Sequence, residues 1–419
     1  MHSSTLLASG PHLRKLLLAG LLIAFGTVAI DMATALKMGP TIVAGDGAQY
    51  VDLAHSLATG RGYTLEIGPW PDKPNVGRAP LWPALLAIPV WLLGAADPRL
   101  VAQCTGAVLH GVSALLLVLL TFRLTGRFWA AVGAGAMLAI YLPETGLVVR
   151  GYSEVAYVAA MLAGVLLFIE DGLLPYLGAF LAGAAVLARP NYAILPFLLM
   201  ALVLLSRNRK TGRLFPAAAT LLFCLPTAFW VARNHAVSGY FPLLSATEGE
   251  TLYGGNNAVV ASQPELWGYW LAPNEIPGEP SKLDLAREKT EAQVNAYYHD
   301  KGVRYVREHL AAMPRMLVGK LVRGFIPMSW TRDPFAIVVA CFRFCRYSLF
   351  LLTFRFWPGR NGVYDAVVAT MFLLTLGTTL VYYGSFRLTY CIEPFLFPYI
   401  AAGIAHAFWP GTATSPDTP

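Results

Sequence analysis

"LRKLLLAGLLIAFGTVAIDMATAL", residues Leu13–Leu36, is an apolar run long enough to cross the hydrocarbon core of a bilayer, and it carries Arg14 and Lys15 at its start. The rest of the 419-residue chain is similar: 56% of its residues are hydrophobic, 13% are charged, and the mean hydropathy is +0.54. A soluble domain of this size needs a more highly charged surface. The composition therefore predicts an all-α polytopic membrane protein.

Further apolar runs predict a bundle of about 10–11 transmembrane spans, because each span needs about 20 apolar residues. The predicted spans are Leu13–Leu36, Leu100–Phe122, Phe128–Leu142, Ser153–Ile169, Leu173–Ala188, Tyr192–Leu205, Leu214–Val231, Phe335–Phe354, Val363–Tyr383 and Leu388–Trp409. The run Leu81–Leu93 is short for a span, and we interpret it as an interfacial or re-entrant helix. Arg343 and Arg346 inside one predicted span either snorkel, face a polar cavity or indicate that this span is misplaced.

The spans divide the chain into four parts. Residues 1–231 form an N-terminal transmembrane module with a first external loop at 37–99, and residues 232–334 form an external region with interfacial helices. Residues 335–409 form the C-terminal transmembrane helices, and the polar tail 410–419 is expected to be disordered. Within the external region, Pro280–His309 reads as helical with Ser281 as a cap, and Met313–Pro327 reads as a helix on the membrane surface.

The placement of the charged residues predicts the orientation of the protein in the membrane. Lys and Arg concentrate in alternate turns between the spans, and cytoplasmic loops carry such an excess. Both termini are therefore predicted to be cytoplasmic, in a multi-pass protein of the inner (plasma) membrane, with any site in the first loop on the external face. The formal charge of +7 reflects this topology, and no basic stripe indicates a nucleic-acid partner. The five cysteines lie within apolar segments and imply no disulfide framework.

The first loop carries the main functional signal, "IVAGDGAQYVDLAHSLATGRGY", Ile42–Tyr63. Its Gly45-Asp46-Gly47 can begin a helix over Ala48–Thr59. Asp46 is then either a simple N-cap or a carboxylate that accepts a proton from a hydroxyl group. The glycines would let another backbone or a substrate approach closely. No P-loop, zinc-ligand spacing or Gly-x-Ser-x-Gly elbow is present, which disfavours soluble nucleotide chemistry.

Six stretches together resemble the glycosyltransferase C (GT-C) superfamily, in particular its bacterial branch similar to dolichyl-phosphate-mannose protein mannosyltransferases and aminoarabinose transferases. The stretches are "DGAQYVDLAHSLATGRGY" from Asp46, "GRAPLWPALLAIP" from Gly77, "GYSEVAY" from Gly151, "AVLARPNY" from Ala185, "ARNHAVSGYFPLLSATEGETLYGGNN" from Ala232 and "FRLTYCIEPFLFPYIAAGI" from Phe386. They span nearly the whole chain in the family's order. The chain differs from the mannosyltransferases in having a lone Asp46 in place of an Asp-Glu pair, and it lacks their large inserted luminal domain.

The resemblance implies transfer of a sugar from a polyprenyl-phosphate donor to an acceptor outside the cytoplasmic membrane, usually with inversion. Asp46 matches the family's general base. Arg78 and Arg387 match basic residues that face the donor phosphate, and Glu154 matches a second acidic residue that contacts the acceptor or a divalent cation. A divalent cation is therefore a candidate cofactor, and the metal requirement stays open.

The chemistry also follows from the residue types. A sugar that leaves a polyprenyl phosphate releases a phosphate monoester, and the planar guanidinium of arginine binds phosphate oxygens in pairs. An arginine at a helix end can instead anchor at lipid headgroups. An ion pair with Arg150, four residues earlier, would also explain Glu154. Further candidate substrate contacts are Tyr50, Tyr63, Arg150, Arg189, Tyr253, Asn256 and Asn257, although "GGNN" at 254–257 is equally typical of a tight turn.

The sequence thus predicts an integral membrane glycosyltransferase of envelope glycan or glycoconjugate assembly, with a glycan, lipid or protein acceptor. It does not indicate which sugar is transferred. The alternative is a transporter or lipid flippase that forms no glycoside. Such proteins often contain internal repeats and carboxylates near the middle of the membrane, and the sequence indicates neither. The glycosyltransferase prediction requires Asp46 and Arg387, far apart in the chain, to meet at one pocket.

Overall fold

The computed structural model describes residues 11–94, 96–195, 214–241, 244–326, 334–354 and 361–408. These residues form α-helices and short 3₁₀ helices and no β-strand; a single bridge pairs Thr64 with Pro74. The predicted all-α class is confirmed. Most of the predicted span Tyr192–Leu205 and the tail 410–419 lie outside the described residues.

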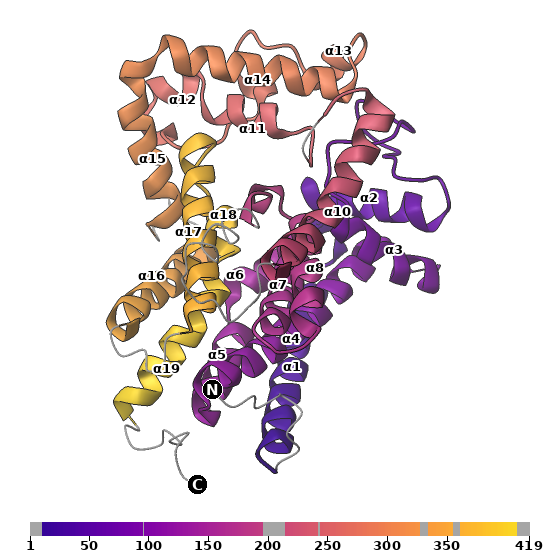
Figure 1. Ribbon diagram of the computed structural model, residues 1–419. Helices are drawn as coiled ribbons and strands as arrows, with labels where there is room; N and C mark the ends of the chain where they lie inside the picture. The colour runs from indigo at the N-terminus through magenta and orange to yellow at the C-terminus, as the bar shows by residue number, and fades with distance from the viewer. Residues whose placement is uncertain are drawn as a thin grey trace.

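The first half of the chain forms a bundle of long apolar helices (Figure 1). In this bundle α1 packs along α4, α4 packs on α5 and α7, α7 packs on α8, and α8 packs on α10. Its elements are α1 (Pro11–Met38), α2 (Asp46–Ala58), α3 (Leu81–Leu93), α4 (Pro98–Thr125), α5 (Phe128–Ala139), α6 (Leu142–Val149), α7 (Glu154–Phe168), α8 (Leu174–Val186) and α10 (Leu214–Ser238). Because α10 continues to Ser238, the predicted module boundary at residue 231 falls inside a helix.

Helix α4, with 28 residues, shows how the sequence defines the ends of a helix. The side chain of Asp97 accepts a hydrogen bond from Arg99 N at 2.9 Å, and Pro98 occupies the first turn of α4, where a missing N–H costs nothing. Gly126 ends the helix in a left-handed conformation with φ of 64°. Between these ends, one face of α4 is buried against its neighbours in the bundle.

Residues 244–326 form a layer of helices that we call the cap region. Figure 1 shows α11, α12, α13 and α14 lying across one end of the bundle, with α15 leading back towards α17. Its helices are α11 (Glu248–Gly255), α12 (Ala258–Ser262), α13 (Lys282–Ala286), α14 (Glu291–Glu308) and α15 (Met313–Phe325). The predicted cap at Ser281 is confirmed, since its hydroxyl accepts from Asp284 N. The predicted stretch Pro280–His309 is two helices rather than one.

The last part of the chain returns to the bundle. It comprises α16 (Pro334–Phe354), α17 (Gly362–Val381), α18 (Phe386–Tyr390), the 3₁₀ helix η6 (Glu393–Leu396) and α19 (Phe397–Phe408). The prediction of one continuous helix over Leu388–Trp409 is wrong, because the chain breaks at residues 391–392 and tightens through Pro394 before α19. Residues 388–403 are nevertheless buried.

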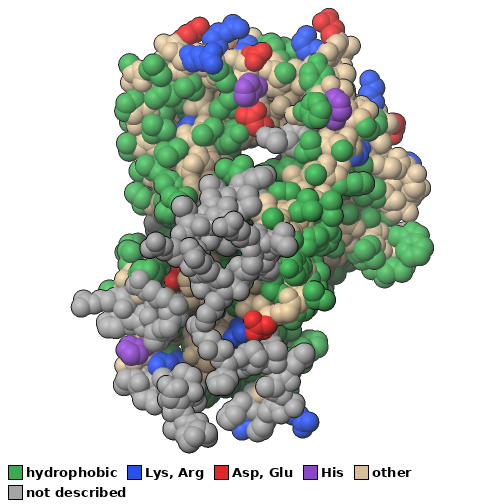
Figure 2. Space-filling view, viewed as in Figure 1, with side chains coloured by type: hydrophobic (Ala, Val, Ile, Leu, Met, Phe, Trp, Pro, Cys, Tyr) green, Lys and Arg blue, Asp and Glu red, His purple; other side chains and the backbone are tan. Residues whose placement is uncertain are grey.

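Fewer of the described helices are long enough to cross a membrane than the number of spans predicted from the sequence. Among the described residues, four helices are long and apolar enough to cross a membrane, or up to five if the bent pair α5 and α6 counts as one span. The four are α1, α4, α16 and α17, and shorter apolar helices form at α3, α7 and α8. The number of 10–11 spans therefore stays a prediction, whereas the multi-pass character is supported by the apolar helices. On the face shown in Figure 2, hydrophobic side chains dominate and many charged ones lie towards the two ends.

The helical bundle contains several buried carboxylates, among them Asp31, Glu144 and Glu393. Asp31 of α1 accepts hydrogen bonds from His110 at 2.7 Å and from Thr145 at 2.7 Å. Glu144 lies 3.6 Å from the other nitrogen of His110. Glu393 pairs with Arg343 and Arg346, which therefore face the interior rather than snorkel. These partners come from different helices, so the sequence spacing did not reveal the clusters.

Candidate functional site

The structure at the start of α2 distinguishes between the two interpretations of Asp46, an N-cap or a carboxylate with another role. Helix α2 begins at Asp46, and the N-cap position is Gly45, with φ of 55° and no side-chain cap. The N-cap interpretation of Asp46 is therefore wrong, and its carboxylate is free for other partners. A Cβ atom on Gly47 would collide with the backbone oxygen of Arg150, so glycine here allows the close backbone approach that the sequence suggested.

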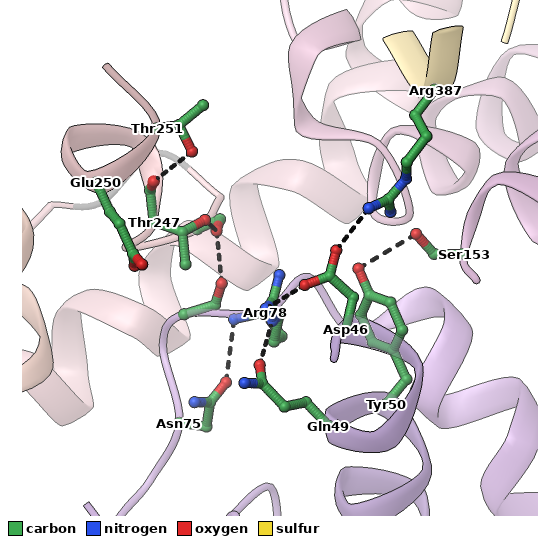
Figure 3. Close-up of polar contacts among 12 residues, drawn as sticks. Asp46, Gln49, Tyr50, Asn75, Arg78, Ser153, Thr247, Glu250, Thr251 and Arg387 are labelled. Atoms are coloured by element: carbon green, nitrogen blue, oxygen red, sulfur yellow. Dashed lines mark hydrogen bonds and ion pairs between the residues drawn. The ribbon is translucent and has the colours of Figure 1, made fainter. Parts of the chain in front are cut away.

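The carboxylate of Asp46 is bridged by two arginines from distant parts of the chain (Figure 3). Arg78 Nη2 lies 2.7 Å from one oxygen, and Arg387 Nη1 lies 2.9 Å from the other. Asp46 and Arg387 are 341 residues apart, and the predicted meeting of these two residues is observed. Arg78 comes from the loop before α3, and Arg387 comes from α18.

A second carboxylate extends this arrangement. Glu154, at the first position of α7, accepts from Arg387 Nε at 2.7 Å and from Arg189 Nη1 at 3.2 Å. Glu154 thus pairs with these two arginines and not with Arg150 as the alternative interpretation required. The five side chains form a row of alternating charge, which we call the charge row: Arg78, Asp46, Arg387, Glu154 and Arg189. With three guanidinium groups and two carboxylates, the charge row carries a net charge of +1.

The charge row is partly open at one end. The side chain of Glu154 is fully buried, whereas those of Asp46, Arg78 and Arg387 are 29%, 20% and 21% exposed. Burial alone would raise the pKa of Asp46, but the guanidinium groups of Arg78 and Arg387 outweigh it and hold this pKa well below its usual value. Asp46 is therefore ionised, and it is a weak base while both arginines remain bound to it.

Side chains that the sequence analysis did not select complete the surroundings of the charge row. Gln49, one turn after Asp46, accepts from Arg78 Nε at 2.7 Å. The Arg387 guanidinium lies over the aromatic ring of Tyr152, at 4.0 Å from the centre of that ring. Tyr383 interacts electrostatically with Arg387, Asp46 and Glu154. The spacing from Asp46 to Gln49 on one helix face was the only available sequence signal for these residues.

The cap region approaches Arg78 from the side opposite Asp46. Figure 3 shows Thr247 and Glu250 facing this part of the site, whereas the Thr251 hydroxyl donates to the backbone oxygen of Thr247. Ser245 Oγ donates to the backbone oxygen of Gly77 at 2.6 Å and lies 2.7 Å from the Thr247 hydroxyl, so the start of α11 is attached to the loop that carries Arg78. Figure 2 shows an opening below the cap region. The open end of the charge row is therefore bordered by hydroxyl and carboxylate side chains.

Two of the candidate substrate contacts, Tyr50 and Tyr63, support the loop that carries Arg78. The Tyr50 ring lies 5.7 Å from the Arg78 guanidinium, and its hydroxyl accepts from Ser153. Tyr63 is buried and donates to the backbone oxygens of Arg78 and Ala79 at 3.1 Å. Arg150 ends α6, and among the described residues no ion pair joins its side chain to the charge row. Arg189, by contrast, belongs to the charge row.

The other three candidates have partners inside the cap region. Tyr253 donates to Glu279 at 2.7 Å. Asn257 caps α12 by accepting from Val260 N. Asn256 donates to the backbone oxygens of Leu252 and Val381 and accepts from Lys320 Nζ at 2.8 Å. These contacts are those of a turn and a helix cap, the other interpretation of "GGNN".

Lys320 shows why Asn256 is needed. Its side chain is buried, and Nζ donates to Asn256 and to the last carbonyl groups of α17, Leu380 O at 3.0 Å and Val381 O at 3.1 Å. Burial lowers the pKa of Lys320 to about 8. Lys320 therefore attaches α15 to the end of α17.

A divalent cation fits the charge row poorly. Both carboxylates are already neutralised by arginines, and the net charge of the row is positive. Across the described ranges, no group of three or more His, Cys, Asp or Glu side chains is arranged to hold a metal ion. The donor set favours an anion, since guanidinium groups bind phosphate oxygens.

Comparison with solved structures identifies the fold. The chain is similar to the archaeal oligosaccharyltransferase AglB from Archaeoglobus fulgidus, solved in complex with an inhibitory peptide and a dolichol-phosphate. The TM-score is 0.51 and the identity 12%, over 94% of this chain and 52% of AglB. The chain shares the fold of the matching part of that structure. It spans about half the length of AglB, and at this identity the likeness shows the fold alone.

A second solved structure is more distant. ArnT from Cupriavidus metallidurans, bound to undecaprenyl phosphate, matches with a TM-score of 0.40 and 13% identity, over 94% of this chain and 81% of ArnT. A likeness this weak carries no argument. No protein-family profile and no curated protein sequence matches the chain.

Replacement of Gly47 tests the close contact that positions Asp46. Gly47→Ala places a methyl group against the Arg150 backbone oxygen and pushes α2 away from it. We expect a loss of about 1–3 kcal/mol in the free energy of unfolding. Thermal unfolding of the purified protein measures this effect. Gly26→Ala is the matched control, because a Cβ atom there meets nothing within 4 Å; equal stability of the two variants would contradict the contact.

The role of Asn256 can be separated from a role in substrate binding. Asn256→Ala removes an acceptor from the buried Lys320 and two donated bonds, so we expect a loss of about 1–3 kcal/mol in stability. The exposed Gln263→Ala serves as the control and should unfold at the wild-type temperature. If Asn256→Ala kept wild-type stability and only weakened substrate affinity, Asn256 would be a binding residue.

The pH dependence of stability reports on the ion pairs of Asp46. Since its pKa is lowered by folding from 3.8, the stabilisation is present above that value and is lost as the pH falls towards the folded-state pKa. The difference in unfolding free energy between wild type and Asp46→Asn should thus stay constant from about pH 7 to about pH 5 and shrink below about pH 4. Chemical unfolding at each pH measures it. A difference that persisted undiminished to about pH 2 would show that Asp46 is not held by the arginines.

Proposed function

We propose that this protein transfers a sugar from a polyprenyl-phosphate donor to an acceptor hydroxyl. The observation that carries the proposal is the bridging of both Asp46 oxygens by Arg78 and Arg387, at the open end of a charge row with net positive charge. A base and a pair of phosphate-binding groups are the two components that such a transfer needs. The similarity of the fold to a structure that contains a dolichol-phosphate is consistent with this donor class.

Arg78 and Arg387 are the proposed donor-phosphate contacts. When the sugar leaves, the phosphodiester becomes a monoester and gains negative charge, which fixed guanidinium groups stabilise more strongly than water does. Each arginine already directs one nitrogen at an oxyanion, the carboxylate of Asp46. A phosphate at the same place would take over part of these bonds.

This competition explains how Asp46 can serve as a base although its pKa is low in the free protein. A bound phosphate shares the two guanidinium groups, so it withdraws part of the positive charge that stabilises the carboxylate and raises the pKa of Asp46. The acceptor O–H then gives its proton to Asp46, and the oxygen bonds to the anomeric carbon. The bond from that carbon to the phosphate oxygen breaks, the phosphate keeps the electron pair, and the sugar configuration inverts.

The proposal also includes the location of the protein and its binding partners. The positive-inside pattern supports a multi-pass protein of the inner (plasma) membrane with cytoplasmic termini, which puts the charge row and the cap region on the external side. An acceptor hydroxyl of a glycan, lipid or protein of the cell envelope can then approach Asp46 from the exposed side of the charge row. Glu154, the buried carboxylate of the charge row, holds Arg387 and Arg189 in place through its ion pairs.

The buried Asp31, Glu144 and Glu393 favour the alternative function, because carboxylates within a helical bundle often mark transport pathways. Each of them is at most 1% exposed and lies beside a basic side chain, so they are enclosed rather than open to a pathway. Reconstituted vesicles separate the two functions: a flippase moves the lipid across the bilayer without forming a glycoside, and a transferase forms the glycoside.

Asp46→Asn tests the proposed base. In cells that lack the protein, the wild type should restore a sugar-sized mass increment on an envelope glycoconjugate, detected by mass spectrometry. Because general base catalysis contributes about 10²–10⁴-fold, Asp46→Asn should leave less than about 1% of that product. The control is Asp52→Asn on the same helix, whose carboxylate accepts from Glu66 N and lies outside the charge row. Full restoration by Asp46→Asn would refute the assignment of the base.

A further inference from the structure

A second ion cluster lies within the helical bundle. Glu393 is 1% exposed and accepts from Arg343 Nε at 3.2 Å and from Tyr347 OH at 3.2 Å. It is also hydrogen bonded to Tyr141 and paired with Arg346. We call Glu393, Arg343 and Arg346 the anchor cluster; it carries a net charge of +1.

The anchor cluster is attached to the same short segment that carries Arg387. Arg343 Nη2 donates to Thr389 Oγ1 at 2.9 Å, two residues after Arg387, and Glu393 follows four residues later. The segment 385–396 therefore has one charged side chain in the charge row and another in the anchor cluster. Because α18 has only five residues and η6 only four, few backbone hydrogen bonds hold this segment in place.

Arg343 also connects the segment to the cap region. Its Nη2 donates to the backbone oxygen of Gly324, near the end of α15, at 2.8 Å. One guanidinium group thus joins α16, α18 and α15. Within the described residues, most of the apolar stretch of α16 is not buried, and the helix packs mainly on α19. The bonds of Arg343 add an attachment of α16 to α18 and α15.

The energetics argue against a purely stabilising role for the anchor cluster. Removing charges from water costs several kcal/mol per ion, and well-packed apolar residues often give equal or greater stability. Two buried nitrogens of Arg346, Nε and Nη2, find no hydrogen-bond partner among the residues that the structure describes, which adds to this cost. Directional bonds to buried ions do, however, fix the position of a segment more strictly than apolar packing does.

We propose that Glu393, Arg343 and Thr389 are positioning residues that set the place of Arg387 in the charge row. These residues contact no substrate and act on Arg387 through α18. This inference rests on the proposed function, in which Arg387 contacts the donor phosphate. The first test of the positioning role needs no transferase activity.

The first test is a double-mutant cycle on thermal unfolding. Asp46→Asn, Arg387→Gln and the double variant measure the coupling of the ion pair, and the cycle is repeated with Thr389→Val, Glu393→Gln or Glu170→Gln added. Thr389→Val is nearly isosteric and removes one bond to Arg343, so it keeps the test valid if Glu393→Gln fails to fold. Glu170→Gln is the matched control: it breaks another buried pair, with Arg123 at 2.8 Å, away from α18.

The coupling between Asp46 and Arg387 should fall by about half or more with Thr389→Val or Glu393→Gln and stay unchanged with Glu170→Gln. A merely structural role would lower the unfolding temperature in all three and leave the coupling intact, and that result would overturn the proposal. In a transferase assay, Thr389→Val should raise the KM for the polyprenyl-phosphate donor about threefold or more without changing the KM for the acceptor. If the coupling falls as expected but no glycoside forms with the wild type, the proposed function fails and the positioning role stands.

Discussion

The ion pairs of Asp46 hold together the parts of the chain on which the site depends. Asp46 opens α2, Arg78 belongs to the following loop, and Arg387 belongs to the last buried segment. No local hydrogen-bond pattern brings these three segments to one place. The bundle must already be assembled for the pairs to form, and once formed they fix the first loop against the C-terminal segment. The geometry of the proposed transfer is thus a consequence of the packing of the whole bundle.

Buried charge recurs in this protein as a way of joining helices that apolar packing would leave free to slide. Asp31 and His110 join α1 to α4, and Glu393 with its arginines joins η6 to α16. In a bilayer, lipid tails are as apolar as leucine, so packing alone gives little preference for one helix register over another. An ion pair or a charged hydrogen bond is satisfied in one register only. This constraint accounts for arginines in a helix that otherwise reads as a membrane span.

The sequence predicted the helical class and most helix positions because long apolar runs bounded by charges admit few other structures in a membrane. It also placed Asp46, Arg78, Glu154, Arg189 and Arg387 among the candidates, and the structure brings these five together. It could not distinguish Arg189 from Asn256 or Tyr63, because the partners of a polar side chain are set by tertiary contacts. The break at η6 was missed and the direction of Arg343 was left open for the same reason: hydropathy records how apolar a segment is and not which neighbours its charges meet.

The most direct test of the central claim is an experimental structure of the protein in a lipid nanodisc with an added polyprenyl phosphate. The account predicts phosphate oxygens within hydrogen-bonding distance of both Arg78 and Arg387, and Asp46 released from at least one of the two guanidinium groups. A phosphate bound elsewhere, with both Asp46 ion pairs unchanged, would contradict it.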